Sequence, residues 1–382
     1  MNVLICGAGI AGLTLGWWLR RAGAEVTLVE RAAGPRSDGY MIDFFGAGYD
    51  VAERMGILAR LHDASADIAE IVYLDGRGRR AGGLRYDAAR AAAGGRVLSV
   101  MRGELERILR SSLDAGAEIR YGAGVTAIRE APGGVDVELT DGSVRRVDLL
   151  VGADGLHSAV RRLVFGPEER YLRPLGYHTA SYLIRDAGLA GEAGRRALLV
   201  SVPDRQAGIY PTRDGDLAAW LVHAVPGTAL PADARAEIAS RYRGMGRLVD
   251  RVLAHCPEDP YYDQVAQIQM PGWSRGRVTL LGDAAHAVSL MAGQGSSMAM
   301  AGAHVLSTEL LGAGVEAALE RYERRMRPFA LGKQRGGRGA ARWMVPHQHW
   351  RITLRNRLFG FADLPGGTAV MSRAFRRLSA GV

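Results

Sequence analysis

The first residues whose types and spacing could do chemistry are Gly7, Gly9 and Gly12, which form a G-x-G-x-x-G pattern. They follow a short apolar run at residues 3–6 and precede a helical stretch at residues 10–22, so they occupy a strand-to-helix turn. In such a turn the glycines permit a tight bend, close approach of a pyrophosphate, and close packing of helix on strand. The helix N-terminus adds free N–H groups and a positive dipole end. The pattern predicts a dinucleotide-binding turn.

Glu30 completes this unit. A second apolar run at residues 26–29 ends at Glu30, which lies 18 residues after Gly12. An acid about 20 residues beyond the last glycine bonds a ribose hydroxyl in such units. Strand, helix, second strand and terminal acid together are much more specific than three glycines alone. The alternative is a glycine-rich turn that binds no ligand.

Two more glycine-centred turns follow buried apolar runs, one around Gly152 and Gly155 and one at residues 282–286. Ligands bind at strand ends in open α/β sheets, so three such turns predict a cofactor that extends across several strands. Asp283 is placed to bond a ribityl hydroxyl of this cofactor. The turn Gly293-Gln294-Gly295 opens a long helix, whose positive end would stabilise the negative charge of a reduced flavin.

The composition is that of an ordinary globular protein, with 382 residues, 48% of them hydrophobic and 23% charged. No apolar run reaches the roughly 18 residues of a membrane helix. Because the N-terminus already forms the first predicted strand, we expect no signal peptide. Cys6 and Cys256 suggest neither a disulfide framework nor a metal site. We therefore expect a cytoplasmic monomer or weak dimer without metal, membrane or nucleic-acid partners.

The net charge of +9 is unevenly distributed. Residues 321–382 contain 14 Lys and Arg against Glu323 and Asp363, a net charge of +12, so residues 1–320 carry −3. A basic segment of this kind attracts polyanions or acidic partners, unless it is simply a solvated helical face. Partner or polyanion binding through the basic tail is therefore an alternative function of a different class.

The order of the motifs resembles the single-component FAD-dependent aromatic hydroxylases, which include para-hydroxybenzoate hydroxylase and the tetracycline-inactivating monooxygenases. The resemblance covers nearly the whole chain. It rests on residues 7–12 with Glu30 and Arg31, on residues 154–161 (Asp-Gly-Leu-His-Ser-Ala-Val-Arg), and on residues 282–286 (Gly-Asp-Ala-Ala-His). It implies FAD as cofactor, NADPH or NADH as reductant, and oxygen transfer from a flavin hydroperoxide. The implied substrate is a small aromatic or polyketide-like secondary metabolite.

The resemblance also implies roles for single residues. Glu30 corresponds to the acid on the adenosine ribose, Asp283 to the aspartate on the ribityl and pyrophosphate side, and Arg102 to an arginine that reaches FAD. Arg36 and Arg161 correspond to NADPH contacts. Three residues have alternative interpretations. Asp154 could cap a helix, Asp43 could form a turn, and Arg36 could be an exposed loop residue. The predicted cofactor-binding set is Gly7, Gly9, Ala11, Gly12, Glu30, Arg31, Asp43, Arg102, Asp154, Gly155, Asp283, Gly293, Gln294 and Gly295.

Four positions depart from the family pattern. Ser289 and Leu290 replace a proline pair, Ser297 replaces an asparagine, and Gly302 replaces an aspartate. In the family these positions lie beside the flavin and influence proton handling and peroxide stability. An FAD-dependent reductase or dehydrogenase on the same fold is therefore the main alternative to a monooxygenase.

The predicted fold class is α/β, with a Rossmann-like FAD-binding domain, an inserted β-sheet substrate domain and a helical C-terminus. We expect the FAD-binding domain at residues 1–170 and 271–345, the substrate domain at 171–270, and a basic helical tail at 346–382 with a last helix at 368–378. His178 and Tyr182 in the inserted sheet are our candidates for residues that face substrate.

Overall fold

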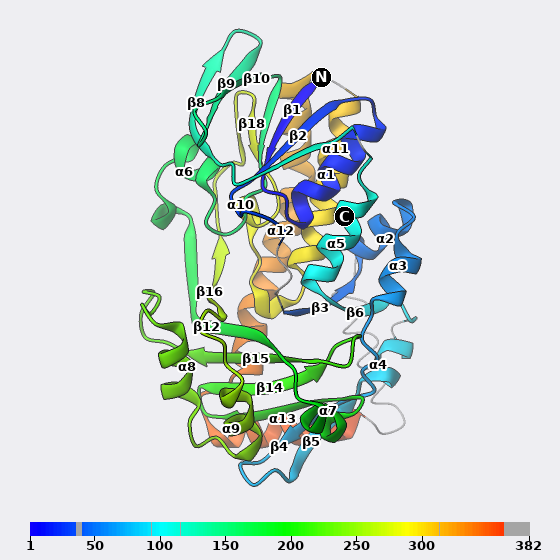
Figure 1. Ribbon diagram of the computed structural model, residues 1–382, viewed down its shortest axis with the longest axis vertical. Coiled ribbons are helices and arrows are strands. Elements are labelled where there is room, and N and C mark those ends of the chain that lie inside the picture. Colours follow the sequence, from blue (N-terminus) through cyan, green and yellow to red (C-terminus); the bar gives the residue numbers. More distant parts are fainter. Residues whose placement is uncertain (36–39, 93, 115, 313, 363–382) are drawn as a thin grey trace.

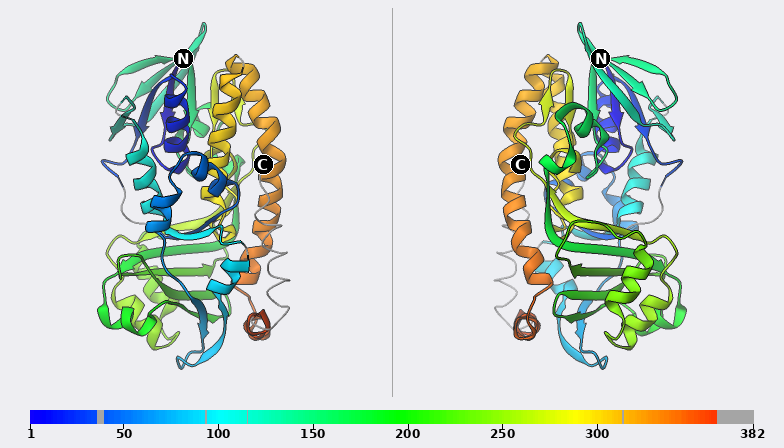
Figure 2. Two further views of the ribbon diagram at one scale, coloured as in Figure 1. Left: turned by 90° about the vertical axis from the view of Figure 1, so that its right-hand side faces the viewer. Right: turned by 90° about the vertical axis from the view of Figure 1, so that its left-hand side faces the viewer.

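The structure of the chain, a computed structural model, describes residues 1–35, 40–92, 94–114, 116–312 and 314–362. Two lobes are stacked along its long axis, an upper lobe that holds the N-terminus and a lower lobe built on a second sheet (Figure 1). The long helix α12 (Val315–Met344) runs along one side of both lobes (Figure 2). The α/β class is as predicted. Arg36 and the helix expected at 368–378 lie outside the described residues.

The upper lobe contains a six-stranded sheet in the order β17-β18-β11-β1-β2-β7. Every neighbouring pair is parallel except β17 with β18. Its central strands are continuous apolar runs, as predicted, because other elements of the chain cover both faces of the sheet. The strands are β1 (Asn2–Cys6), β2 (Glu25–Glu30), β7 (Glu118–Tyr121), β11 (Leu149–Gly152), β17 (Ser274–Arg275) and β18 (Val278–Leu280).

Helix α1 packs against α5 and α11 in the core of this lobe. A small antiparallel sheet in the order β10-β9-β8 lies beside it. The helices are α1 (Ile10–Arg21), α2 (Ala47–Arg54), α3 (Leu58–Asp63), α5 (Arg102–Ser112), α6 (Ala159–Phe165), α10 (Asp283–His286) and α11 (Gly295–Leu311), and the small sheet has β8 (Val125–Ala131), β9 (Gly134–Leu139) and β10 (Val144–Val147).

The lower lobe contains a seven-stranded sheet in the order β16-β12-β15-β14-β13-β4-β5. Five of its strands come from the range 171–270, but β4 and β5 come from the first part of the chain. We therefore propose to count β4 and β5 with the sheet domain. The strands are β4 (Glu70–Leu74), β5 (Arg80–Arg85), β12 (Leu172–Ile184), β13 (Arg196–Val202), β14 (Arg205–Pro211), β15 (Leu217–Ala224) and β16 (Tyr261–Ile268).

The two faces of the seven-stranded sheet have different neighbours. One face forms a core with α7 (Ala187–Ala193), α8 (Ala234–Tyr242) and α9 (Arg247–Ala254). The other contacts the two-stranded sheet of β3 (Met41–Phe45) and β6 (Val97–Met101), which lies between the lobes (Figure 1). The remaining elements are α4 (Tyr86–Ala92), α13 (His349–Ala362) and two short 3-10 turns, Glu168–Arg170 and Leu290–Ala292. In the described ranges no helix is long and apolar enough to cross a membrane.

Candidate cofactor site

Three glycine turns meet at one edge of the six-stranded sheet. β1, β11 and β18 are parallel neighbours, so their carboxyl ends lie side by side. A Cβ atom on Gly7, whose φ is +107°, would lie 2.4 Å from the carbonyl oxygen of Ala153. A Cβ atom on Gly282 would lie 2.9 Å from the Cβ of Ala11. The first turn therefore touches the other two, as the hypothesis of one extended ligand requires.

The first turn has the shape of a phosphate site. A Cβ atom on Gly12 would lie 2.0 Å from the carbonyl oxygen of Gly7, so only glycine lets α1 pack this closely. A Cβ atom on Gly9 would project toward Glu106, 3.2 Å from Oε1. No side chain caps the N-terminus of α1, and the first N–H groups of a helix have no partner within it. This arrangement fits the pyrophosphate of a dinucleotide.

Glu30 is held beside the first turn by two backbone amides. Its Oε2 accepts a hydrogen bond from Ala8 N at 3.0 Å, and its Oε1 accepts one from Ala32 N at 2.9 Å. Each carboxylate oxygen has a second lone pair, so Glu30 can also accept a hydrogen bond from a ribose hydroxyl. The neighbouring Arg31 is exposed.

Arg102 begins α5 on the other side of the same turn. Its Nη2 lies 2.7 Å from Oε1 of Glu106 and 3.7 Å from the position that a Cβ atom of Gly9 would take. Burial lowers the pKa of Arg102, but Glu106, Tyr40 and Tyr261 outweigh burial and raise it. A fixed positive charge at this position suits a pyrophosphate group.

Asp283 stands at the third turn, where it begins α10. Its side chain is exposed, yet the surrounding protein desolvates the carboxyl and raises its pKa, while Arg102 opposes that shift. Its Oδ1 lies 3.7 Å from the position of a Cβ atom on Gly295, the first residue of α11. Asp283, Arg102 and the start of α11 therefore lie together, although the sequence separates them widely.

The departures from the family pattern lie in the segment before α11 and in α11 itself. Ser289 has a φ of +107°, which is rare for a residue with a side chain, and its Oγ accepts a hydrogen bond from Met291 N at 3.2 Å. Gly293 is left-handed, and Gln294 precedes the helix without capping it. Ser297 Oγ donates to the carbonyl oxygen of Phe45 at 2.7 Å and joins α11 to β3. Backbone strain of this kind is concentrated at functional sites.

Asp154 caps α6. Its carboxylate accepts hydrogen bonds from Ser158 Oγ at 2.5 Å, Ala159 N at 2.7 Å and Val160 N at 3.1 Å. These contacts match the alternative that Asp154 caps a helix. In this role Asp154 holds the second glycine turn in place. Gly155 beside it has a φ of +80°, and nothing lies within 4 Å of where its Cβ would be.

Arg161 is a structural residue in this fold. Its side chain is 0% exposed and lies 2.7 Å from Oε2 of Glu168, and it donates to the carbonyl oxygens of Ala284 at 3.0 Å and Leu156 at 2.6 Å. These contacts are all with groups of the protein, and the NADPH contact of Arg161 stays a prediction. Arg161 joins the second glycine turn to the third.

Asp43 on β3 is held by two hydroxyl groups. Its Oδ1 accepts hydrogen bonds from Tyr86 at 2.5 Å and Ser99 at 2.9 Å. Burial raises the pKa of Asp43, and these two hydrogen bonds oppose the shift. Sequence reasoning missed Tyr86 and Ser99, because they come from α4 and β6 and no local pattern links them to Asp43.

His178 and Tyr182, our candidates for residues that face substrate, lie on the side of the seven-stranded sheet away from β3 and β6. Both lie on the face of β12 that α8 and α9 cover, where they are 3% and 4% exposed. His178 Nδ1 lies 3.0 Å from the hydroxyl of Tyr262, and Tyr182 donates to the carbonyl oxygen of Val252 at 2.9 Å. Burial lowers the pKa of His178. Successive residues of a strand face opposite sides, and these two belong to the far side.

The near face of the same sheet carries residues that the sequence analysis did not select. Ser181 is the cross-strand partner of Tyr261 on β16, and Tyr261 lies by Arg102. Tyr210 accepts a hydrogen bond from Met41 N of β3 at 2.6 Å. Trp220 packs in the same group. The period-two pattern of β12 could have suggested this face as an alternative, but it does not say which face meets the cofactor.

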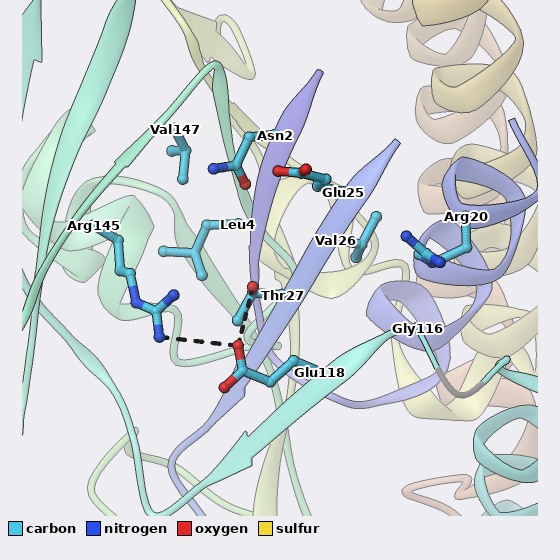
Figure 3. Close-up of a pocket in the computed structure, with 10 residues that line it drawn as sticks. All are labelled: Asn2, Leu4, Arg20, Glu25, Val26, Thr27, Gly116, Glu118, Arg145 and Val147. Atoms are coloured by element: carbon cyan, nitrogen blue, oxygen red, sulfur yellow. Dashed lines mark hydrogen bonds and ion pairs between the residues drawn. The ribbon is translucent and has the colours of Figure 1, made fainter. Parts of the chain in front are cut away.

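Two surface cavities lie away from the turns. The first, of about 240 Å³, includes Asn2 and Glu25, which begin β1 and β2, so it lies at the strand ends opposite the glycine turn. Within it Glu118 lies 3.9 Å from Arg145 and accepts a hydrogen bond from Thr27 at 3.4 Å (Figure 3). The second, of about 250 Å³, lies by the β14–β15 turn. No residue of the three glycine turns lines either cavity.

The fold and the three turns define a dinucleotide-binding flavoprotein. The chain belongs to the FAD binding domain family, which it matches over residues 1–333. FAD is its cofactor, and the glycine cradle, the uncapped start of α1 and the placement of Arg102 and Asp283 fit this molecule. In the described part of the chain no group of His, Cys, Asp or Glu side chains is arranged to hold a metal ion.

Similar proteins agree with this assignment. An uncharacterized protein of Mycobacterium tuberculosis (strain CDC 1551 / Oshkosh) is 34% identical over 330 residues, which cover 82% of this chain and 86% of that protein. A flavin-dependent monooxygenase of Legionella longbeachae serogroup 1 (strain NSW150) is 29% identical, with 88% of each chain covered. The crystal structure of tetracycline destructase Tet(55) aligns with a TM-score of 0.82 at 26% identity and covers 97% of each chain. The chain is thus an FAD-dependent oxidoreductase in a family that contains flavin-dependent monooxygenases.

Proposed function

We propose that this enzyme is an NAD(P)H-dependent monooxygenase that transfers one atom of O2 to a small aromatic or polyketide-like molecule. The observation that supports this most is the meeting of three glycine turns at one sheet edge. The near face of the seven-stranded sheet packs against β3 and β6, and we propose that it forms a wall of the substrate site. The flavin-dependent monooxygenase and the tetracycline destructase among similar proteins support the same class of reaction.

We propose that Arg102 and the amides of the first turn hold the pyrophosphate, that Glu30 binds the ribose, and that Asp283 binds the ribityl chain. FAD, when bound, supplies electron transfer from NAD(P)H and the activation of O2. The protein orients the substrate and excludes water. Its residues therefore act mainly by binding and positioning, and no side-chain nucleophile is required.

The substrate proposal depends on the side chains between the two sheets. Tyr210 and Trp220 come from the seven-stranded sheet, and Met41 and Met101 come from β3 and β6. Aromatic rings favour offset or edge-to-face contacts with other rings, and methionine adapts to irregular shapes. A wall of this composition suits a planar, largely apolar ring system with a few polar substituents.

We further propose that the enzyme works in the cytoplasm as a monomer or weak dimer. Its two cysteines, Cys6 and Cys256, are free and buried, which suits a reducing compartment. Light scattering during size-exclusion chromatography measures the oligomeric state directly. A stable oligomer at micromolar concentration would contradict this part of the proposal.

Isotope labelling tests the reaction. The FAD-loaded enzyme is reduced with NADPH or NADH without oxygen, then mixed with ¹⁸O₂ in the presence of tetracycline or simple phenols as probes. We expect a product that contains one ¹⁸O atom. A product that gains two hydrogen atoms without the label would identify the reductase alternative and overturn the proposal.

A further inference from the structure

Helix α13 has an inverted distribution of polar and apolar residues. Its inner side buries Arg355 and Asn356, which are 1% and 6% exposed, beside the apolar Ile352, which is 7% exposed. On its outer side Trp350, Leu354 and Leu358 are 59%, 45% and 46% exposed. The apolar stripe of a surface helix normally faces the protein core. An outward stripe with a spacing of four residues indicates that another apolar surface meets it.

Arg355, on the buried side of α13, contacts several groups of the protein, and these contacts fix the orientation of the helix. Arg355 donates to the carbonyl oxygen of Met344 at 2.5 Å and to Ser201 Oγ at 2.9 Å. Its guanidinium carbon lies 4.3 Å from the centre of the Tyr73 ring. Rotating the helix to bury the leucines would turn Arg355 out to solvent and break its contacts with Met344, Ser201 and Tyr73. The outward direction of the stripe is therefore a stable property of the fold.

The stripe is bordered by positive charge. Trp343 at the end of α12 is 46% exposed, and its ring lies 6.4 Å from that of Phe359 on α13. We call Trp343, Trp350, Leu354 and Leu358 the α13 patch. The exposed Arg351 lies with its guanidinium carbon 5.2 Å from the Trp350 ring, and Arg357 is also exposed. Between Glu323 and Asp363 the sequence contains no acidic residue.

We propose that the α13 patch binds the surface of an anionic lipid bilayer. Tryptophan and leucine enter the boundary between headgroups and acyl chains, and arginine interacts with anionic headgroups. A second copy of the chain is a poorer occupant, because a two-fold interface places the same patch on itself and brings like charges together. That no helix in the described ranges is long and apolar enough to span a membrane does not oppose this proposal, since interfacial binding needs none.

Vesicle co-sedimentation of the full-length, FAD-loaded chain tests the proposal. We expect binding to vesicles that contain phosphatidylglycerol, little binding to pure phosphatidylcholine, and weaker binding at high salt. Leu354→Ser and Leu358→Ser should each weaken binding about tenfold through lost apolar burial. Arg351→Ala and Arg357→Ala should each weaken it about fivefold. The matched controls are Leu163→Ser and Arg129→Glu, because these side chains are 44% and 66% exposed on other elements.

Each of the following four outcomes would overturn the proposal. Failure to sediment with anionic vesicles excludes a membrane. Binding that falls in the arginine variants but not in the leucine variants identifies a general polyanion site. A dimer that dissociates in Leu354→Ser identifies a second copy as the occupant. Vesicle binding that appears only after deletion of residues 363–382 shows that this segment covers the patch in the intact chain.

Discussion

At the residue scale, the cofactor site depends on positions where only glycine fits and on a few charged groups at strand ends. Gly7 and Gly12 permit contacts that no other residue allows. Arg102 and Asp283 come from different elements and lie close together. Asp283 acts to raise the pKa of Arg102, and Arg102 acts to lower the pKa of Asp283. We therefore expect FAD binding to respond strongly to small substitutions in the glycine turns and much less to substitutions at the protein surface.

Gly7→Ala should destabilise the protein and prevent FAD binding. The residue has a positive φ, and the added Cβ would overlap the Ala153 carbonyl oxygen. Gly23 also has a positive φ, of +80°, with nothing within 4 Å. Gly23→Ala therefore measures the conformational cost alone, about 1–2 kcal/mol. In urea unfolding, Gly7→Ala should lower the free energy of unfolding by clearly more than Gly23→Ala does. Equal decreases in the two variants would show that the contact between the turns is not rigid.

Asp283→Asn should weaken FAD binding by about tenfold or more, because it removes a charged hydrogen-bond acceptor. Fluorescence titration of the apoprotein with FAD measures the dissociation constant. Asp250→Asn is the control, since Asp250 is an exposed acid on α9. An unchanged dissociation constant for Asp283→Asn would remove Asp283 from the proposed site.

At the element scale, the two lobes are joined by contacts between elements that are distant in sequence. His157, in the turn before α6, lies 2.9 Å from Oε1 of Glu168 and 3.2 Å from Oδ1 of Asp263 on β16. The hydrogen bond to Asp263 and then that to Glu168 raise the pKa of His157 to about 9, against the opposing effect of burial. His157 is therefore protonated at neutral pH and links the second glycine turn to the lower sheet.

This link should make stability depend on pH. The pKa of His157 rises on folding, so its contribution is complete below the unfolded value of about 6.5 and is lost as pH rises through the folded value. Melting temperatures between pH 6 and 10 should fall in the wild type by more than in His157→Gln. Parallel curves would show that the histidine is not charged in the folded protein. The side chain is 40% exposed, so the effect should be modest.

At the scale of the whole molecule, the cofactor site lies where the upper lobe meets the lower one. The glycine turns and α1 belong to the upper lobe, whereas Tyr261, beside Arg102, belongs to β16 of the lower sheet (Figure 1). Helix α12 runs along both lobes (Figure 2). A ligand held at this junction should stabilise the lobes together.

We therefore expect FAD to raise the stability of the whole chain. At a free concentration a hundredfold above the dissociation constant, a ligand that binds only the folded state adds about 2.7 kcal/mol. Thermal unfolding with and without FAD measures this, and Asp283→Asn at the same FAD concentration should gain less. Two separate transitions, only one of which responds to FAD, would show that the lobes unfold independently.

Local pattern in the sequence was sufficient to predict the glycine turns and the buried strands before them. It also predicted the helix at residues 10–22, the long helix that opens after Gly295, and the inserted sheet. These features depend on short-range chemistry, since glycine tolerates positive φ and an apolar run between helices forms a buried strand. The same local reading assigned Asp154 either to the cofactor or to a helix cap, and its contacts in the structure are those of a cap.

Only the tertiary structure decided which groups meet. Period-two alternation gives β12 two faces, but packing of α8 and α9 determines that His178 and Tyr182 lie on the side away from β3 and β6. Arg161 contacts Leu156 and Glu168, which are near it in sequence, but its third partner, the carbonyl oxygen of Ala284, comes from a segment 123 residues away. The sequence alone determined the turns and their chemistry, because those follow from adjacent residues. The tertiary structure determined the walls of the proposed site and the outward direction of the α13 stripe. Both depend on contacts between segments that are far apart in the chain.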